Sequence, residues 1–331
     1  MRRRPATATL AALTALTALV AAVTTGCGGD ADDEADKPDP LRGQQWALDA
    51  LKLPEAWDTA EADDTVIAVV DTGVDPDHPD LKGRLVAGHD FVDNDDDPRD
   101  LNGHGTHVAG IAAAHTDNGI GVAGGAPGAK IMPVRVLGAD GSGSNDAITK
   151  GIVWAAQHGA DVINLSLGES GLMARLLKGG VLNQAIAAAN GKGAVVVAAA
   201  GNDSTLLQPY KLDTPVLVVN AAGENGAPAS FTNFGAQNAV AAPGVDILST
   251  LPTYRTQETA GNTSGYGTLS GTSMASPYVA AVAALLHRQG LDPAAIMKTI
   301  RDTAANPRNL PKLGLGNVNA AAAVKAAKGS S

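Results

Sequence analysis

The run Thr65-Val66-Ile67-Ala68-Val69-Val70 is almost entirely apolar, and it ends directly at Asp71. β-Branched residues dominate it, and they do not alternate with polar ones. This pattern is typical of a strand buried on both faces, as in a parallel sheet covered by helices. The stretch therefore indicates an α/β protein.

Similar apolar runs recur along the chain, separated by segments with helical periodicity. We expect further strands at residues 131–136, 162–165, 194–199 and 216–219. We expect helices at residues 104–114, 146–158 and 182–190, and another that begins near Ser273. The alternation predicts an α/β fold of three layers, with a mostly parallel central sheet and helices on both faces. In such sheets, ligands bind at the carboxyl ends of the strands.

Three polar side chains stand at the ends of these predicted elements. Asp71 follows the first strand, His104 begins a helix, and Ser273 opens the late helix. A serine at a helix N-terminus lies among unpaired N–H groups, which favour a developing negative charge. Each residue also has a purely structural interpretation, as a turn aspartate, a helix-start histidine and an N-cap serine. The chain order Asp, His, Ser is one of the known orders of a catalytic triad.

The motifs around these residues resemble those of the subtilisin-like serine proteases, peptidase family S8, and especially the thermitase branch. They read D-T-G-V-D at Asp71, N-G-H-G-T-H-V-A-G at His104 and S-G-T-S-M-A-S-P at Ser273. The similarity extends over about residues 44–289. It implies that Ser273 is the nucleophile, His104 the general base, and Asp71 the residue that orients the imidazole. It also implies that Asn202 and the Ser273 N–H form an oxyanion hole.

The resemblance further implies a cleft in which the substrate adds as an extended strand. Two segments form its edges, one with Ser142 and Gly143, the other Ser166-Leu167-Gly168. The latter and Ala199-Ala200-Gly201 form the walls of the S1 pocket. Because both walls are small and uncharged, we expect broad specificity with a preference for apolar P1 residues. The expected reaction is peptide-bond hydrolysis through an acyl-enzyme, without a catalytic cofactor.

Acidic loops suggest one or two structural calcium ions. Residues 90–100 contain six aspartates and one arginine, an oxygen density that suits calcium. A solvated acidic loop is the alternative. The resemblance to a thermitase-type calcium loop favours Asp90, Asp93 and Asp95 as ligands.

A second calcium site is implied by the resemblance alone. It would join an acid of the N-terminal arm, an acid after the first strand and a later loop. The predicted ligands are Asp39, Asp80, the side chain of Asn118 and the carbonyls of His115, Ile120 and Val122.

The N-terminal segment has the composition of a secretion signal. Three arginines precede an uncharged apolar run over residues 6–23, which ends at Thr24-Thr25-Gly26-Cys27. A membrane span is the alternative. Cys27, the single cysteine, occupies a position resembling the lipobox of bacterial lipoproteins, although Thr24 replaces the usual larger aliphatic residue. We expect residues 1–26 to be a signal peptide and Cys27 to be lipidated, which would attach the protein to a membrane surface. A free cysteine in a mobile tail is the alternative.

The rest of the chain divides into two parts. Residues 27–40 are rich in Gly, Asp and Pro and predict a disordered tether, whereas residues 41–331 form the predicted peptidase domain. Without residues 1–26, 21 Lys and Arg residues face 34 Asp and Glu residues, a net charge of −13. No basic patch stands out, which argues against nucleic acid as a partner. We expect a bacterial monomer that acts on proteins or peptides, on the extracellular face of the membrane or secreted.

Three functions remain open at this point. The first is a lipid-anchored endopeptidase of broad specificity. The second is a dedicated processing protease, because residues 44–51 and 125–131 resemble mycosins. The third is an inactive surface-binding protein that uses the fold as a scaffold, since a fold alone does not imply a function.

Overall fold

The computed structural model describes residues 37–167, 180–206, 210–211 and 213–329. These residues belong to one compact unit, residues 34–331. The predicted signal peptide, Cys27 and Gly168 lie outside the described residues. Among the helices within these ranges, none combines the length and the apolar character that a membrane crossing needs.

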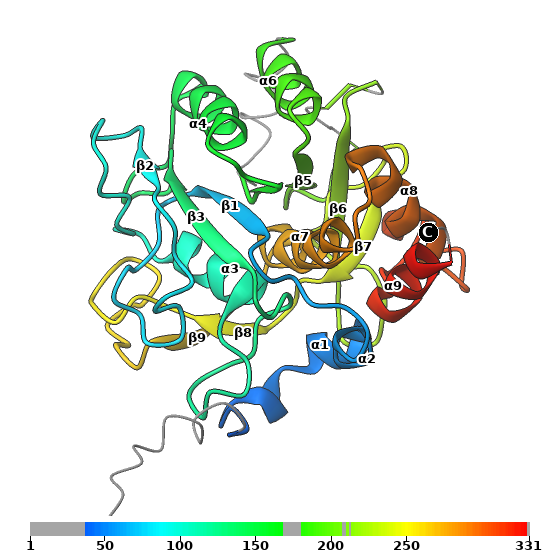
Figure 1. Ribbon diagram of the computed structural model, residues 1–331, viewed down its shortest axis with the longest axis horizontal. Coiled ribbons are helices and arrows are strands. Elements are labelled where there is room, and N and C mark those ends of the chain that lie inside the picture. The colour runs from blue at the N-terminus through cyan, green and yellow to red at the C-terminus, as the bar shows by residue number, and fades with distance from the viewer. Residues whose placement is uncertain (1–36, 168–179, 207–209, 212, 330–331) are drawn as a thin grey trace, which may run out of the picture. The chain divides into compact units, whose positions relative to one another are not determined.

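A seven-stranded parallel sheet forms the centre of the unit (Figure 1). Its strands run in the spatial order β2-β3-β1-β4-β5-β6-β7. They are β1 (Val66–Asp71), β2 (His89–Asp90), β3 (Lys130–Arg135), β4 (Val162–Leu165), β5 (Val195–Ala199), β6 (Val216–Ala222) and β7 (Val240–Pro243). All six neighbouring pairs in this sheet are parallel. A separate antiparallel pair consists of β8 (Ile247–Thr250) and β9 (Tyr266–Leu269).

Helices cover both faces of the sheet (Figure 1). The longer ones are α3 (His104–Ala113), α4 (Asn145–Gln157), α6 (Gly180–Gly191), α7 (Thr272–Arg288), α8 (Pro293–Thr303) and α9 (Ala320–Lys328). Short elements near the N-terminus are η1 (Arg42–Gln44), α1 (Trp46–Ala50) and α2 (Leu53–Trp57), and η2 (Pro311–Leu313) lies between α8 and α9. These layers confirm the predicted α/β fold with helices on both faces.

The first apolar run shows why both faces are covered. Side chains alternate along a strand, so Ile67 and Val69 pack in the cluster that contains α3 and α7. Ala68 and Val70 pack in the opposite cluster, with α4 and α6. All four side chains are fully buried. A strand with two buried faces has no polar face, which explains the absence of alternation in its sequence.

The structure changes two boundaries that bear on function. Asp71 is the last residue of β1 rather than the residue after it, because its carbonyl oxygen accepts hydrogen bonds from Val136 N and Leu137 N.

The end of the predicted tether is also ordered. Lys37 N donates to Asp117 O at 3.1 Å, and the Asp39 carboxylate accepts from the backbone of residues 117 and 118. Disorder is therefore a wrong prediction for residues 37–40.

Candidate active site

Asp71 and His104 meet at the carboxyl end of β1. The Nδ1 atom of His104 lies 2.7 Å from Asp71 Oδ1, which also accepts a hydrogen bond from Thr72 N at 2.7 Å. Asp71 is fully buried, whereas the His104 side chain is 22% exposed. The imidazole is thus oriented from inside the protein and remains accessible from outside.

The electrostatic surroundings favour a protonated His104. Burial, the largest single influence, acts to lower the pKa of this imidazole. The charge and hydrogen bond of Asp71, with the charges of Asp100 and Glu258, outweigh it, so the pKa of His104 is raised. An imidazolium formed during a reaction would be stabilised here.

Asp100 anchors the start of α3, a role that the sequence analysis did not predict. Its fully buried carboxylate accepts five hydrogen bonds, from the hydroxyls of Thr72 and Thr106 and the backbone N–H groups of Asn102, Gly103 and Thr106. These bonds tie the first turn of α3 to the residue after Asp71. The only signal in the sequence was the position of Asp100, four residues before His104. Five other aspartates nearby left nothing to distinguish it.

Close backbone packing joins the same two elements. A Cβ atom at Gly105 would lie 2.1 Å from Gly73 O and 3.2 Å from Asp71 Cβ. Only glycine fits at this position, so α3 approaches β1 closely enough for His104 to reach Asp71.

Ser273 lies in the first turn of α7, where the motif predicted it. Its side chain is buried, and its Oγ donates a hydrogen bond to Ser166 O at 3.2 Å. Within the described residues, no hydrogen bond joins Ser273 to His104. The two residues come from α3 and α7, which pack against each other on one face of the sheet.

Asn202 follows β5 and is oriented by Thr272, the residue before Ser273. Its Oδ1 accepts hydrogen bonds from Thr272 N at 2.9 Å and from Thr272 Oγ1 at 3.0 Å. Since the oxygen faces these donors, the Nδ2 group faces away from them. A Cβ atom built on Gly271 would lie 3.5 Å from Asn202 Nδ2 and 3.6 Å from Ser273 N. Two donors therefore border the small space beside Gly271.

The predicted substrate-binding segments lie side by side at the same edge of the sheet. Ser166 and Leu167 follow β4. The segment Ala199-Ala200-Gly201 begins at the last residue of β5, the hydrogen-bonded neighbour of β4. The turn with Ser142 and Gly143 follows β3, on the other side of β1. Asp71 thus stands between the two predicted edges. Ser142 is exposed and Ser166 is buried.

Asp39 and Asp80 form a buried acidic pair beside residues 115–122. Asp80 Oδ1 accepts from Asn118 Nδ2 and Asp80 Oδ2 from Val122 N, while Asn118 Oδ1 accepts from Ile120 N. Burial raises the pKa of Asp80 to about 6, and the charge of Asp39 acts in the same direction. Neither acid forms an ion pair with a cationic side chain in the described ranges. Both buried carboxylates accept hydrogen bonds from backbone and amide N–H groups, and a hard cation such as calcium would compensate their remaining negative charge.

The other predicted calcium ligands, Asp90, Asp93 and Asp95, are engaged by protein groups in this arrangement. The guanidinium of Arg135, on β3, pairs with both Asp90 and Asp93. Asp90 Oδ1 is also engaged by Val92 N and Asp93 N, and Asp95 Oδ1 accepts from Asp97 N. The loop itself contains one base, Arg99, and the pairing with Arg135 on a distant strand was not predicted. In the described part of the chain, no group of three or more His, Cys, Asp or Glu side chains is placed to hold a metal.

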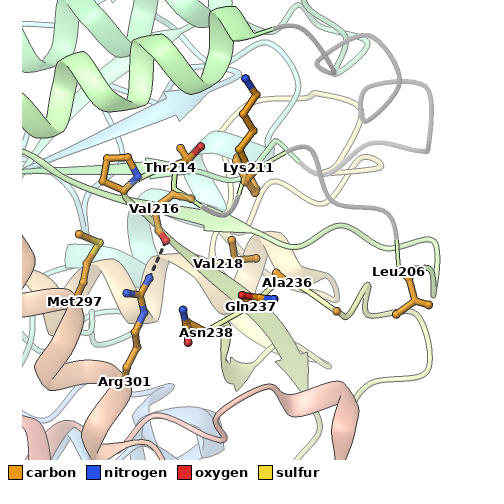
Figure 2. Close-up of a pocket in the computed structure, with 13 residues that line it drawn as sticks. Leu206, Lys211, Thr214, Val216, Val218, Ala236, Gln237, Asn238, Met297 and Arg301 are labelled. Carbon is orange, nitrogen blue, oxygen red and sulfur yellow. Dashed lines mark hydrogen bonds between the residues drawn. The ribbon is translucent and has the colours of Figure 1, made fainter.

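A separate cavity of about 410 Å³ lies along β6 and α8. Figure 2 shows Arg301 reaching toward β6, where its Nη2 donates to Val216 O at 3.0 Å. Lys211, Gln237 and Met297 also line the cavity, which includes none of the predicted catalytic residues. It is distinct from the site built on β1.

Comparison with known proteins agrees with this geometry. The family model described as the subtilase family, Peptidase S8, matches residues 62–322. The chain belongs to the subtilase family, and it is a serine endopeptidase of the subtilisin type.

Among individual proteins, thermitase of Thermoactinomyces vulgaris is 46% identical over 262 residues, which cover 79% of this chain and 88% of thermitase. A thermophilic serine proteinase of Bacillus sp. strain AK1 is 47% identical over 266 residues, 80% of this chain and 62% of that protein. A solved protease structure from Pseudoalteromonas arctica has a TM-score of 0.76 at 35% identity, covering 88% of this chain and 99% of that one.

Proposed function

We propose that this endopeptidase uses Asp71, His104 and Ser273 as a catalytic triad, with Asn202 and the Ser273 N–H as the oxyanion hole. The observation that carries the proposal is the 2.7 Å contact between Asp71 Oδ1 and His104 Nδ1. This contact lies at the carboxyl end of β1. Asn202 follows β5, and Ser273 lies in the first turn of α7. The order of these residues and the family membership support the same assignment.

In the proposed mechanism, Ser273 Oγ attacks the scissile carbonyl while His104 Nε2 accepts its proton. The Ser273 hydroxyl points to Ser166 O in the free protein, so it must turn toward His104 when the substrate binds. His104 then donates the proton to the leaving amine, which releases one product and leaves an acyl-enzyme. Water activated by His104 hydrolyses the acyl-enzyme. Asp71 holds the imidazole and stays ionised throughout.

The proposed specificity is broad, with a preference for apolar P1 residues. Support comes from the wall segments, in which Ser166, Leu167, Ala199 and Ala200 carry no charge. A narrow processing protease would instead cleave few sequences. Digestion of casein beside a set of defined peptides separates the two, since only the broad enzyme degrades casein at many sites.

A fluorophosphonate probe tests the triad directly, because it labels only an activated serine. We expect labelling of the purified protein and none of the Ser273→Ala variant. An unlabelled but folded wild-type protein would contradict the proposal and favour the inactive scaffold.

We also propose that Cys27 is lipidated after removal of residues 1–26. Its position after the basic and apolar segments supports this. Expression of the full chain in a bacterial host should place the protein in the membrane fraction, and Cys27→Ser should release it. Equal membrane retention of the two proteins would contradict lipidation.

Calcium is proposed at the Asp39 and Asp80 site only. The residues that would hold it are these two acids and the oxygens of residues 115–122. A bound calcium ion would supply positive charge to the buried carboxylates. The Asp80 carbonyl already contacts this loop just after the end of α3, since it accepts a hydrogen bond from His115 N at 2.9 Å.

A further inference from the structure

The loop between β8 and β9, residues 251–265, crosses to the start of α3. Glu258 N donates a hydrogen bond to Asn102 O at 2.9 Å, and Tyr254 Oη donates to Asp100 O at 2.8 Å. A Cβ atom at Gly103 would lie 2.8 Å from Glu258 Cβ and 3.5 Å from Glu258 Cγ. The Glu258 side chain therefore rests on the residue that precedes His104.

The Glu258 carboxylate has no counter-charge within the part of the chain that the structure describes. It forms neither an ion pair nor a hydrogen bond with any residue in the described ranges, and its residue is half-buried. Its charge nonetheless reaches His104, since it contributes to raising the pKa of that imidazole. An unpaired carboxylate held beside the reacting imidazole is available to a cation that enters from solvent.

Asn102 links Glu258 to the predicted substrate edge. Its carbonyl accepts from Glu258 N, its Oδ1 accepts from His104 N at 3.2 Å, and its Nδ2 donates to Ala139 O at 3.0 Å. Ala139 lies just before the edge segment with Ser142 and Gly143. Through its carbonyl and its side chain, this one residue positions the loop of Glu258, the start of α3 and the edge against each other.

We propose that Glu258 is a specificity-determining residue that selects substrates with Lys or Arg at P2. The inference rests on the proposed function, because it takes the cleft edges and the S1 walls as assigned there. Side chains of an extended substrate alternate between opposite sides. A P1 side chain between the walls at residues 166–167 and 199–201 therefore directs the P2 side chain away from them, toward His104 and Glu258. The preferred substrate carries an apolar P1 residue and a basic P2 residue.

The test compares matched fluorogenic peptides that differ only at P2, with Lys or its uncharged analogue norleucine. We expect kcat/KM to be higher for the Lys peptide, by about two- to fivefold for a partly exposed ion pair. In Glu258→Gln this ratio should fall to about 1, whereas any effect of the lost charge on His104 should change kcat/KM for both peptides by the same factor. The wild-type ratio should also decrease as salt is added, because salt screens exposed charges.

Glu61→Gln is the matched control. Glu61 is an exposed acid that precedes β1, so it lies at the opposite edge of the sheet from Asp71. This variant should keep the wild-type ratio. An unchanged ratio in Glu258→Gln would overturn the inference. In peptides that differ only at P1′, a preference for Lys that Glu258→Gln abolishes, with no such change at P2, would overturn it as well. Cleavage of the norleucine peptide that persists in Ser273→Ala would instead overturn the proposed function.

Discussion

The hydroxyl of Ser166 donates a hydrogen bond to the carbonyl oxygen of Ser273, 2.8 Å away, while the hydroxyl of Ser273 donates to the carbonyl oxygen of Ser166. Pro277 explains why the first bond exists. In α7 the Ser273 carbonyl would normally accept from the N–H of residue 277, but proline has none. Ser166, the residue after β4, supplies the missing donor. The segment that follows β4 thereby also completes the helix that carries the predicted nucleophile.

Replacing Ser166 by alanine should therefore destabilise the protein by about 1–3 kcal/mol, since a buried carbonyl loses its donor. The free energy of urea unfolding measures this in the Ser273→Ala background, where autolysis is absent and the carbonyl is retained. Ser142→Ala, at an exposed position of the other edge, should change stability by no more than about 0.5 kcal/mol. Equal effects of the two substitutions would contradict the role given to Ser166.

Gly271→Ala should impair catalysis and leave the fold intact. The backbone of Gly271 is extended, with φ 163°, so alanine adopts it without strain. Its methyl group would occupy the space bordered by Asn202 Nδ2 and Ser273 N, at 3.5 and 3.6 Å. If an oxyanion forms there, kcat should fall by about 10²-fold, comparable with the loss of one oxyanion donor.

The control for this variant is Gly191→Ala, at a position where the added Cβ meets no atom within 4 Å. It should retain wild-type kcat. Full activity of Gly271→Ala would place the oxyanion elsewhere, whereas a lowered melting temperature would mean that the substitution acts through the fold.

The raised pKa of His104 predicts the pH dependence of the reaction. The base must be neutral, so kcat/KM should rise with pH through an apparent pKa above the ordinary histidine value of about 6.5. Asp71→Asn removes the largest influence that raises this pKa, so the imidazole should titrate at lower pH. In the same variant kcat should fall by about 10⁴-fold.

Imidazole NMR titration in the Ser273→Ala background measures this pKa without turnover. An unshifted titration in Asp71→Asn would contradict the electrostatic role of Asp71. The free energy of unfolding should change with pH in the direction opposite to kcat/KM. Because the folded pKa is raised, the pair stabilises the fold fully below the unfolded pKa, and this contribution is lost as pH rises through the folded pKa.

Chelation should lower thermal stability through the Asp39 and Asp80 site. For calcium at about 1,000 times its Kd, binding adds about 4 kcal/mol, so EDTA should lower Tm by roughly 10 °C. Asp80→Asn should abolish most of this response. Asp93→Asn should retain it, because Asp93 pairs with Arg135. An unchanged wild-type Tm after thorough chelation would remove the calcium proposal.

Local patterns in the sequence were sufficient for the architecture and for the grouping of the predicted active-site residues. Unalternated apolar runs indicated strands buried on both faces, and parallel strands end at a common edge. That rule alone brings Asp71, the segment after Ser166 and the segment before Asn202 together. The apolar run at residues 162–165 also predicted β4 with its observed bounds, Val162–Leu165.

Tertiary structure decided the features that depend on partners far apart in the chain. Arg135 neutralises Asp90 and Asp93, although neither acid is near it in sequence. Glu258 reaches the residue before His104 only because a loop more than 150 residues later folds back over α3. Such contacts involve single side chains on irregular loops, which leave no periodic signal. The sequence by itself determined which edge of the sheet carries the chemistry, and the packing of distant loops decided which charges surround it.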